Sequence, residues 1–142
     1  MIIPFNKPFL TGNEAKYIEQ AVMSGKISGD GIFTKKCHQF FESKYCFNKV
    51  LLTTSCTDAL EMAAILLNIK EGDEVIAPSY SFVSTVNAFV LRGAKIIFAD
   101  SESSTPNIDA DKIESLITPK TKVIIIVDII NNCKMTLFKY YN

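Results

Sequence analysis

The sequence predicts an α/β fold in which helices surround a mostly parallel sheet. Short β-branched or aliphatic segments alternate with amphipathic helical segments from residue 50 onward. The strand segments do not alternate apolar and polar residues, as expected for strands that are covered by helices on both faces. The chain has 142 residues, of which 48% are hydrophobic and 21% charged, a composition typical of one globular domain.

Two helices are expected before the sheet begins. Thr11 followed by Glu14 is a capping-box pattern, and apolar residues then repeat at helical spacing up to residue 22. A loop that contains glycines, residues 26–31, leads to a second expected helix at residues 33–45. The apolar stripe of this second helix consists of Phe33, Cys37, Phe40 and Phe41.

Four strands and three helices are expected in the remainder of the chain. Gly72 and Gly93 lie where helices give way to strands, as helix-terminating glycines do. The alternation of strands with helices predicts βαβ units on a mostly parallel sheet. The expected strands are residues 50–53, 74–77, 95–99 and 122–127, and the expected helices between them are residues 56–67, 82–91 and 109–117.

Composition argues against several classes of function. Fifteen basic and fifteen acidic residues give a formal net charge of zero, so neither nucleic acid nor a membrane surface is an expected partner. The cysteines form no CxxC pair and His38 is the only histidine, so no metal site is expected. The first residues lack a signal-peptide pattern, and the apolar run at residues 123–127 is too short to cross a bilayer. The sequence therefore predicts a cytoplasmic protein with reduced thiols.

Hydroxyl residues follow the first expected strand, at the kind of sheet edge where α/β proteins bind ligands. Ser55 could cap the next helix by accepting a hydrogen bond from the N–H of Thr57 or Asp58. The same N–H groups could instead hold a phosphate. The residues alone leave both interpretations open. A P-loop is not expected, because no Gly-Lys-Ser/Thr sequence is present.

A second candidate region follows the next expected strand. Pro78 ends that strand, and Phe82 is expected to begin a helix. An aromatic ring beside a phosphate-binding helix suits a flat phosphorylated cofactor, although a plain core position is the commoner role for such a residue. Asp100 ends the third expected strand as a solvated turn or cap residue, and His38 is expected in a packing or surface role.

A series of short phrases runs through residues 2–127 in a specific order. They include Ile3-Pro4-Phe5-Asn6-Lys7-Pro8, Thr54-Ser55-Cys56-Thr57-Asp58-Ala59-Leu60, Pro78-Ser79-Tyr80-Ser81-Phe82-Val83 and Arg92-Gly93-Ala94-Lys95. In this order they resemble the DegT-type nucleotide-sugar aminotransferases of the fold-type I pyridoxal-phosphate superfamily. The resemblance implies that the chain, residues 1–142, is the incomplete N-terminal portion of the large, cofactor-binding domain.

The resemblance also implies a cofactor, pyridoxal 5'-phosphate (PLP), and a set of residues that bind it. Cys56 would contact the phosphate through its backbone N–H, and Thr57 would do so through its N–H and its hydroxyl. Ser55 belongs to the same turn, and Phe82 stands at the position of the aromatic that stacks on the pyridine ring. Cys56 replaces the commoner glycine of the family, which leaves a backbone contact unchanged.

The reaction implied is amino transfer from glutamate to a nucleotide-linked 4-keto-6-deoxy sugar by a homodimer. The Ser-Cys-Thr turn and the phrase at residues 87–95 resemble most closely the branch that makes dTDP-4-amino-4,6-dideoxygalactose. That branch serves surface polysaccharides such as O-antigen lipopolysaccharide and enterobacterial common antigen.

The resemblance weakens toward the end of the chain. The Schiff-base lysine and the pyridine-partnering aspartate of the family would lie beyond residue 142, so no catalytic residue is assigned. Residues 128–142 form an atypical tail in which the family's Val-His-x-x-Gly turn is absent. We therefore expect the chain as given to be inactive. The alternatives are a non-catalytic remnant, an interaction fragment that pairs with a full-length relative, and a Rossmann-like module, against which the lack of GxGxxG argues.

Overall fold

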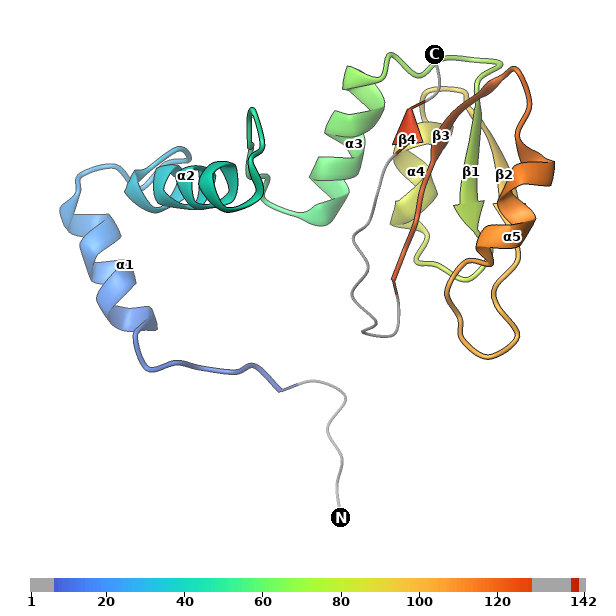
Figure 1. The fold of residues 1–142 in the computed structure, drawn as a ribbon. Coiled ribbons are helices and arrows are strands. Elements are labelled where there is room, and N and C mark those ends of the chain that lie inside the picture. The colour runs from blue at the N-terminus through green and yellow to red at the C-terminus, as the bar shows by residue number, and fades with distance from the viewer. Residues whose placement is uncertain (1–6, 129–138, 141–142) are drawn as a thin grey trace. The chain divides into compact units, whose positions relative to one another are not determined.

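The computed structural model describes residues 7–128 and 139–140 of the chain, which divides into two compact units, Met1–Leu52 and Thr53–Asn142. The first unit holds two helices, and the second holds a sheet with its own helices (Figure 1).

The first unit begins with α1 (Glu14–Met23), whose start differs in detail from the expected capping box. The carboxylate of Glu14 accepts hydrogen bonds from the backbone N–H of Thr11 at 2.6 Å and of Gly12 at 2.9 Å. Asn13, not Thr11, is the N-cap residue, so only the glutamate half of the box forms. The backbone bond from Thr11 is the main cause that lowers the pKa of Glu14 to about 2.

The second helix of this unit, α2 (Ile32–Tyr45), carries the expected aromatic stripe but does not bury it. Tyr17 of α1 meets Phe33 of α2 edge-on, with 5.5 Å between the ring centroids. Neither α1 nor α2 has a buried residue in the described chain. The two helices therefore contact each other through rings at their surfaces and leave most apolar side chains exposed.

The predicted strand at residues 50–53 is wrong, because these residues form no strand in the structure. The backbone N–H of Val50 donates to Glu42 Oε1 at 3.2 Å, and the N–H of Leu52 donates to His38 Nε2 at 3.1 Å. Side chains of α2 thus take the backbone donors that a sheet ladder would have used. His38 has the structural role expected of it.

The second unit contains a four-stranded sheet in the order β2-β1-β3-β4. β1 is the central strand and pairs in parallel with both β2 and β3, while β3 pairs antiparallel with β4. The mostly parallel sheet predicted from the sequence is therefore confirmed. The strands are β1 (Glu74–Pro78), β2 (Lys95–Ala99), β3 (Thr121–Ile124) and β4 (Lys139–Tyr140).

Helices cover both faces of this sheet (Figure 1). Val75 and Phe89 belong to the core on the side of α3 and α4, whereas Ile76 and Ile108 belong to the core on the side of α5. All five residues of β1 are buried, which explains why its sequence is apolar on both faces. The helices are α3 (Cys56–Leu66), α4 (Ser84–Val90), α5 (Ala110–Ile113) and the 3₁₀ helix η1 (Glu114–Leu116).

The helix ends agree with the sequence in one case and differ in another. Gly93 follows α4 with φ 86°, as a helix-terminating glycine should. After α3, however, Asn68 takes the left-handed conformation at φ 49°, and the N–H of Ile69 bonds back to Ala64 at 3.1 Å. Gly72 lies later, in a turn, so the prediction that it ends α3 is wrong. Asparagine can take this role because its side chain tolerates the left-handed region.

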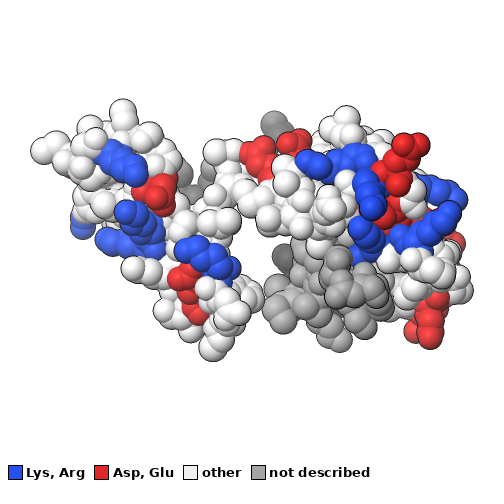
Figure 2. All heavy atoms as spheres, turned by 90° about the horizontal axis from the view of Figure 1, so that it is seen from above, with Lys and Arg blue, Asp and Glu red and all other residues white. Residues whose placement is uncertain are grey.

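Charged side chains of both signs mix on the face of the molecule that Figure 2 displays. Lys122 Nζ lies 3.3 Å from Asp73 Oδ2, and Lys95 Nζ lies 4.0 Å from Glu74 Oε1. Both carboxylates are largely buried at the amino end of β1, where pairing offsets their loss of hydration.

Candidate functional site

A cavity of about 420 Å³ lies in the second unit, between helix α3, helix α4 and the segment that follows β3. Figure 1 shows that the N-terminus of α3 and the carboxyl end of β1 are at the same end of this unit. The carboxyl end of a parallel sheet is where α/β proteins bind ligands. The cavity is lined by Cys56, Ala59, Leu60, Ala63, Thr85, Ile125, Ile126, Val127 and Asp128.

Ser55 is the N-cap of α3, as one of the two interpretations of the sequence predicted. Its backbone is extended, and its side chain accepts a hydrogen bond from the N–H of Asp58 at 3.1 Å. The hydroxyl of Thr54 donates to the carboxylate of Asp58. This bond first, and the Ser55 hydroxyl second, lower the pKa of Asp58, which therefore stays ionised at neutral pH.

The cap leaves two backbone donors of α3 free. Within residues 7–128, no acceptor takes the N–H of Cys56 or of Thr57. Both residues are exposed, and Cys56 lines the cavity. Free N–H groups at the positive end of a helix of 11 residues fit a phosphate group. The cap at Ser55 uses only the N–H of Asp58, so it leaves the N–H groups of Cys56 and Thr57 available to an anion.

Phe82 is 76% exposed, so the interpretation of this ring as a plain core residue is wrong. The expectation that it begins a helix is also wrong, because α4 starts at Ser84 and Phe82 lies in the preceding turn. Phe82 does not line the 420 Å³ cavity. Its carbonyl oxygen does accept a hydrogen bond from the N–H of Thr85 at 2.9 Å, and Thr85 is one of the lining residues.

Two polar residues that line this cavity, Thr85 and Asp128, were not among the site residues predicted from the sequence. Thr85 is 8% exposed, and its Oγ1 accepts a hydrogen bond from Ser81 Oγ at 2.7 Å. Asp128 follows β3, and its Oδ1 accepts a hydrogen bond from Asn107 Nδ2 at 3.3 Å. Its position directly after the expected strand at residues 122–127 was the available signal for Asp128, whereas no such signal marks Thr85. The tail at residues 128–142 lies almost wholly outside the described residues, and its departure from the family pattern stays a prediction.

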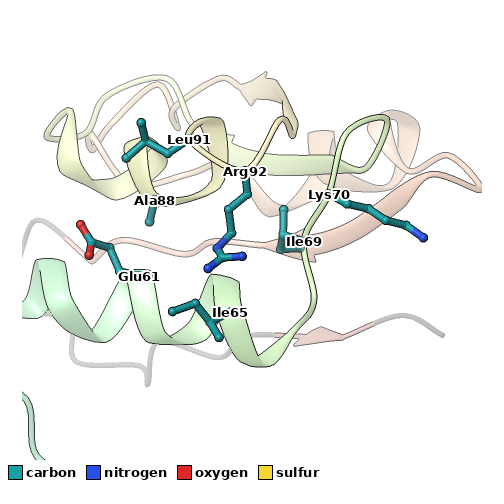
Figure 3. Close-up of a pocket in the computed structure, with 7 residues that line it drawn as sticks. All are labelled: Glu61, Ile65, Ile69, Lys70, Ala88, Leu91 and Arg92. Atoms are coloured by element: carbon teal, nitrogen blue, oxygen red, sulfur yellow. The ribbon is translucent and has the colours of Figure 1, made fainter.

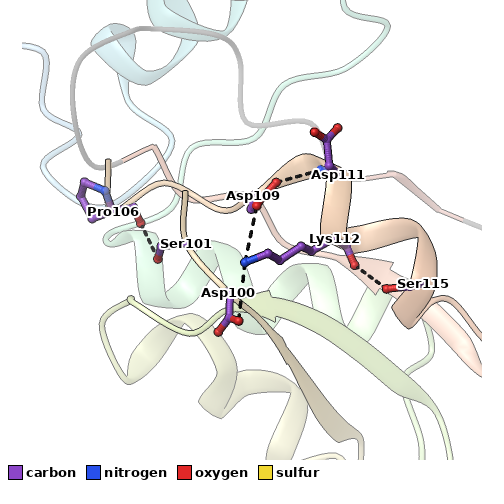
Figure 4. Close-up of polar contacts among 7 residues, drawn as sticks. All are labelled: Asp100, Ser101, Pro106, Asp109, Asp111, Lys112 and Ser115. Carbon is purple, nitrogen blue, oxygen red and sulfur yellow. Dashed lines mark hydrogen bonds and ion pairs between the residues drawn. The ribbon is translucent and has the colours of Figure 1, made fainter. Parts of the chain in front are cut away.

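Asp100 has the structural role that its sequence position indicated. Its carboxylate is 77% exposed and lies 3.7 Å from Lys112 Nζ, which is also 3.6 Å from Asp109 Oδ2 (Figure 4). Asp109 caps α5 by accepting from the N–H of Asp111 at 3.1 Å. Lys112 thus ties the end of β2 to the start of α5.

A second cavity, of about 450 Å³, lies between α3 and α4 (Figure 3), and neither Cys56 nor Thr57 lines it. Lys70 and Arg92 precede β1 and β2, so this cavity extends toward the amino end of the sheet. None of the described residues that line it begins a helix. The residues that line it are Glu61, Ile65, Ile69, Lys70, Ala88, Leu91 and Arg92.

Among the described residues, no cluster of three or more His, Cys, Asp or Glu side chains could hold a metal ion. None of the helices in that part of the chain is both long and apolar enough to cross a membrane.

Comparison with known sequences places the chain among aminotransferases. The model of the DegT/DnrJ/EryC1/StrS aminotransferase family matches residues 8–137. The GDP-perosamine synthase of Escherichia coli O157:H7 is 37% identical over 125 residues, which cover 88% of this chain and 34% of that protein. The GDP-perosamine synthase of Vibrio cholerae is 34% identical over 132 residues, which cover 90% and 35%. The chain thus spans about a third of the length of these relatives.

Solved structures agree with this comparison and with the predicted fold. A protein from Streptococcus pneumoniae described as a sugar aminotransferase superposes in its PMP form with a TM-score of 0.80 at 32% identity, over 89% of this chain and 32% of that one. Its PLP form gives a TM-score of 0.78, over 87% of this chain and 31% of that one. The aminotransferase TlmJ of Streptoalloteichus hindustanus superposes with a TM-score of 0.78 at 32% identity, over 87% of this chain and 34% of that one. The α/β fold is therefore that of the fold-type I aminotransferases, and the chain belongs to the DegT/DnrJ/EryC1/StrS aminotransferase family.

Proposed function

We propose that this chain supplies the phosphate-binding part of a PLP-dependent nucleotide-sugar aminotransferase. The observation that carries the proposal is the pair of free N–H groups of Cys56 and Thr57 at the N-terminus of α3, beside a cavity at the carboxyl end of the sheet. Family membership supports it, as do solved neighbours in PLP and PMP forms.

Four residues would bind or orient the cofactor. The N–H groups of Cys56 and Thr57 and the hydroxyl of Thr57 would donate to the phosphate, and Ser55 would hold the turn by capping α3. The exposed ring of Phe82 would stack on the pyridine ring, a contact worth about 1 kcal/mol beyond burial. When bound, PLP supplies an electron sink for amino transfer.

The proposed reaction is amino transfer from glutamate to a nucleotide-linked 4-keto-6-deoxy sugar, in the cytoplasm, by a homodimer. The Ser-Cys-Thr turn and the phrase at residues 87–95 support a dTDP-linked sugar for surface polysaccharide, the enterobacterial common antigen and O-antigen class. The relatives described above are named GDP-perosamine synthase, so a GDP-linked sugar is the competing substrate. Ligand-observed NMR with both sugars on a protein that contains this segment would decide between them, and preference for the GDP sugar would contradict the dTDP assignment.

Calorimetric titration with PLP tests the proposed cofactor site. We expect saturable binding that inorganic phosphate competes away. Thr57→Ala should weaken it by about fivefold, since about 1 kcal/mol is lost, and Phe82→Ala should weaken it by at least as much, because buried ring surface is lost together with the stacking contact. Leu91→Ala, at an exposed position on the second cavity, is the matched control and should leave the affinity unchanged. Binding that ignores phosphate, or equal losses in the control, would contradict the proposal.

The second, 450 Å³ cavity favours another candidate function, in which the chain is an interaction fragment that pairs with a full-length relative. Leu91 is 80% exposed and Ile65 is 56% exposed on this surface, which Arg92 and Glu61 flank with opposite charges (Figure 3). Co-purification of the chain with a full-length family member would support this function. Leu91→Asp should then abolish the pairing, whereas charge reversal at the exposed Lys120 should not.

A further inference from the structure

Thr85 is a buried residue that also lines a cavity. It lies in the first turn of α4 and is 8% exposed, yet it lines the 420 Å³ cavity together with Cys56. A buried hydroxyl is costly unless it is hydrogen-bonded. Ser81 Oγ satisfies it, at 2.7 Å from Thr85 Oγ1.

The same two residues bracket Phe82. The N–H of Thr85 donates to the carbonyl oxygen of Phe82 at 2.9 Å. Together with the side-chain bond from Ser81 to Thr85, this backbone bond fixes the turn that carries Phe82. The N–H of Ser79 donates to Ala99 on β2 at 2.8 Å, which anchors the start of the turn to the sheet. Phe82 itself is 76% exposed, so packing of its own side chain does little to hold it.

On the basis of the proposed function, we propose that the Ser81–Thr85 hydrogen bond positions Phe82 for stacking on a flat cofactor ring. Thr85 is then a positioning residue that acts through the turn. Without the bond, the turn at residues 79–85 gains conformational freedom, and cofactor binding must remove that freedom again.

Three variants of the chain separate this role from simple stability. Thr85→Val keeps the shape of the side chain and removes the hydroxyl, Thr85→Ser keeps the hydroxyl, and Ser81→Ala breaks the same bond from the less buried side. The matched control is Thr118→Val, which removes a 2.6 Å hydrogen bond to Glu74 elsewhere in the second unit. Two quantities are measured: amide hydrogen exchange at residues 79–85 without cofactor, and PLP affinity by calorimetry.

We expect Thr85→Val and Ser81→Ala to speed exchange at residues 79–85 selectively and to weaken PLP binding about fivefold, no more than the loss expected for Phe82→Ala. Combining Thr85→Val with Phe82→Ala should add no further loss, because both act through one contact. Thr85→Ser should restore the affinity, and Thr118→Val should change neither quantity.

The outcomes distinguish this inference from the proposed function. If Phe82→Ala weakens PLP binding while Thr85→Val and Ser81→Ala do not, the positioning role is overturned and the cofactor site stands. If exchange rises throughout the second unit in both variants, Thr85 is only structural and the inference fails. If the unsubstituted chain binds no PLP, the proposed function fails, and this inference fails with it.

Discussion

Replacing Ser55 by alanine tests the structural basis of the candidate site. The side chain of Ser55 accepts the N–H of Asp58 at 3.1 Å and makes Ser55 the N-cap of α3. Ser55 is exposed, so its removal opens no cavity in the core, and the loss of the cap dominates the effect. Removing an N-cap serine costs about 1 kcal/mol, with a range of roughly 0.5–2.

That cost raises the unfolding equilibrium constant about fivefold. It also depends on pH, because the Ser55 hydroxyl helps to lower the pKa of Asp58 in the folded state. A lowered carboxyl pKa contributes stability above the pKa of the unfolded chain, and this stability is lost as the pH falls through the folded value. The difference in unfolding free energy between the Ser55→Ala variant and the parent chain should therefore become smaller in acid.

Urea denaturation followed by far-ultraviolet circular dichroism measures the loss. Ser55→Asp should keep most of the stability, because aspartate caps as well as serine. Thr57→Ala removes a hydroxyl for which the described chain offers no partner, and it should change stability by less than about 0.5 kcal/mol. If Ser55→Ala were as stable as the parent chain, or Thr57→Ala as costly, the capping account would be refuted.

Three further perturbations have defined outcomes. The pKa of Glu14 is about 2, below its ordinary value of 4.5, so the stability that the ionised carboxylate gives to α1 is lost as the pH falls from 4.5 to 2. Glu14→Gln should abolish this acid-dependent loss. A carboxyl titration of Glu14 by NMR with a midpoint near 4.5 would contradict this. Gly93→Ala should destabilise the second unit by more than Gly72→Ala does. Both glycines have positive φ, but only at Gly93 would the new Cβ lie 3.0 Å from Glu71 Cα. Equal losses of unfolding free energy in urea denaturation would rule out that contact. Phe89→Ala should cost about 3–5 kcal/mol and the exposed Leu91→Ala less than about 0.5, by the same assay, and similar values would show that Phe89 is not at the core.

The fold was largely predictable because its signals are local. The apolar residues of β1, the Ser55 cap and the terminating Gly93 each follow from the residue types in a short window. The strand expected at residues 50–53 was wrong, because its backbone donors are taken by His38 and Glu42, many residues away. Such tertiary partners leave no mark in the local pattern.

The candidate site was predictable only in part, for the same reason. A helix that starts after hydroxyl residues predicts backbone N–H groups that could hold a phosphate, whereas the family resemblance singled out Cys56 and Thr57 among them. The exposure of Phe82 and the burial of Thr85 depend on how α4 packs on the sheet. In the run of serine, threonine and aromatic residues before α4, nothing in the sequence singles out the hydroxyl that would line a cavity.

The most direct test of the phosphate-binding role is an amide NMR titration of the chain with PLP. We expect the amide signals of Cys56 and Thr57 to shift most and to saturate together, and inorganic phosphate to reproduce these two shifts at higher concentration. Amide shifts confined to the second cavity, around Leu91 and Arg92, or no saturable shift at Cys56 and Thr57, would contradict the phosphate-binding role.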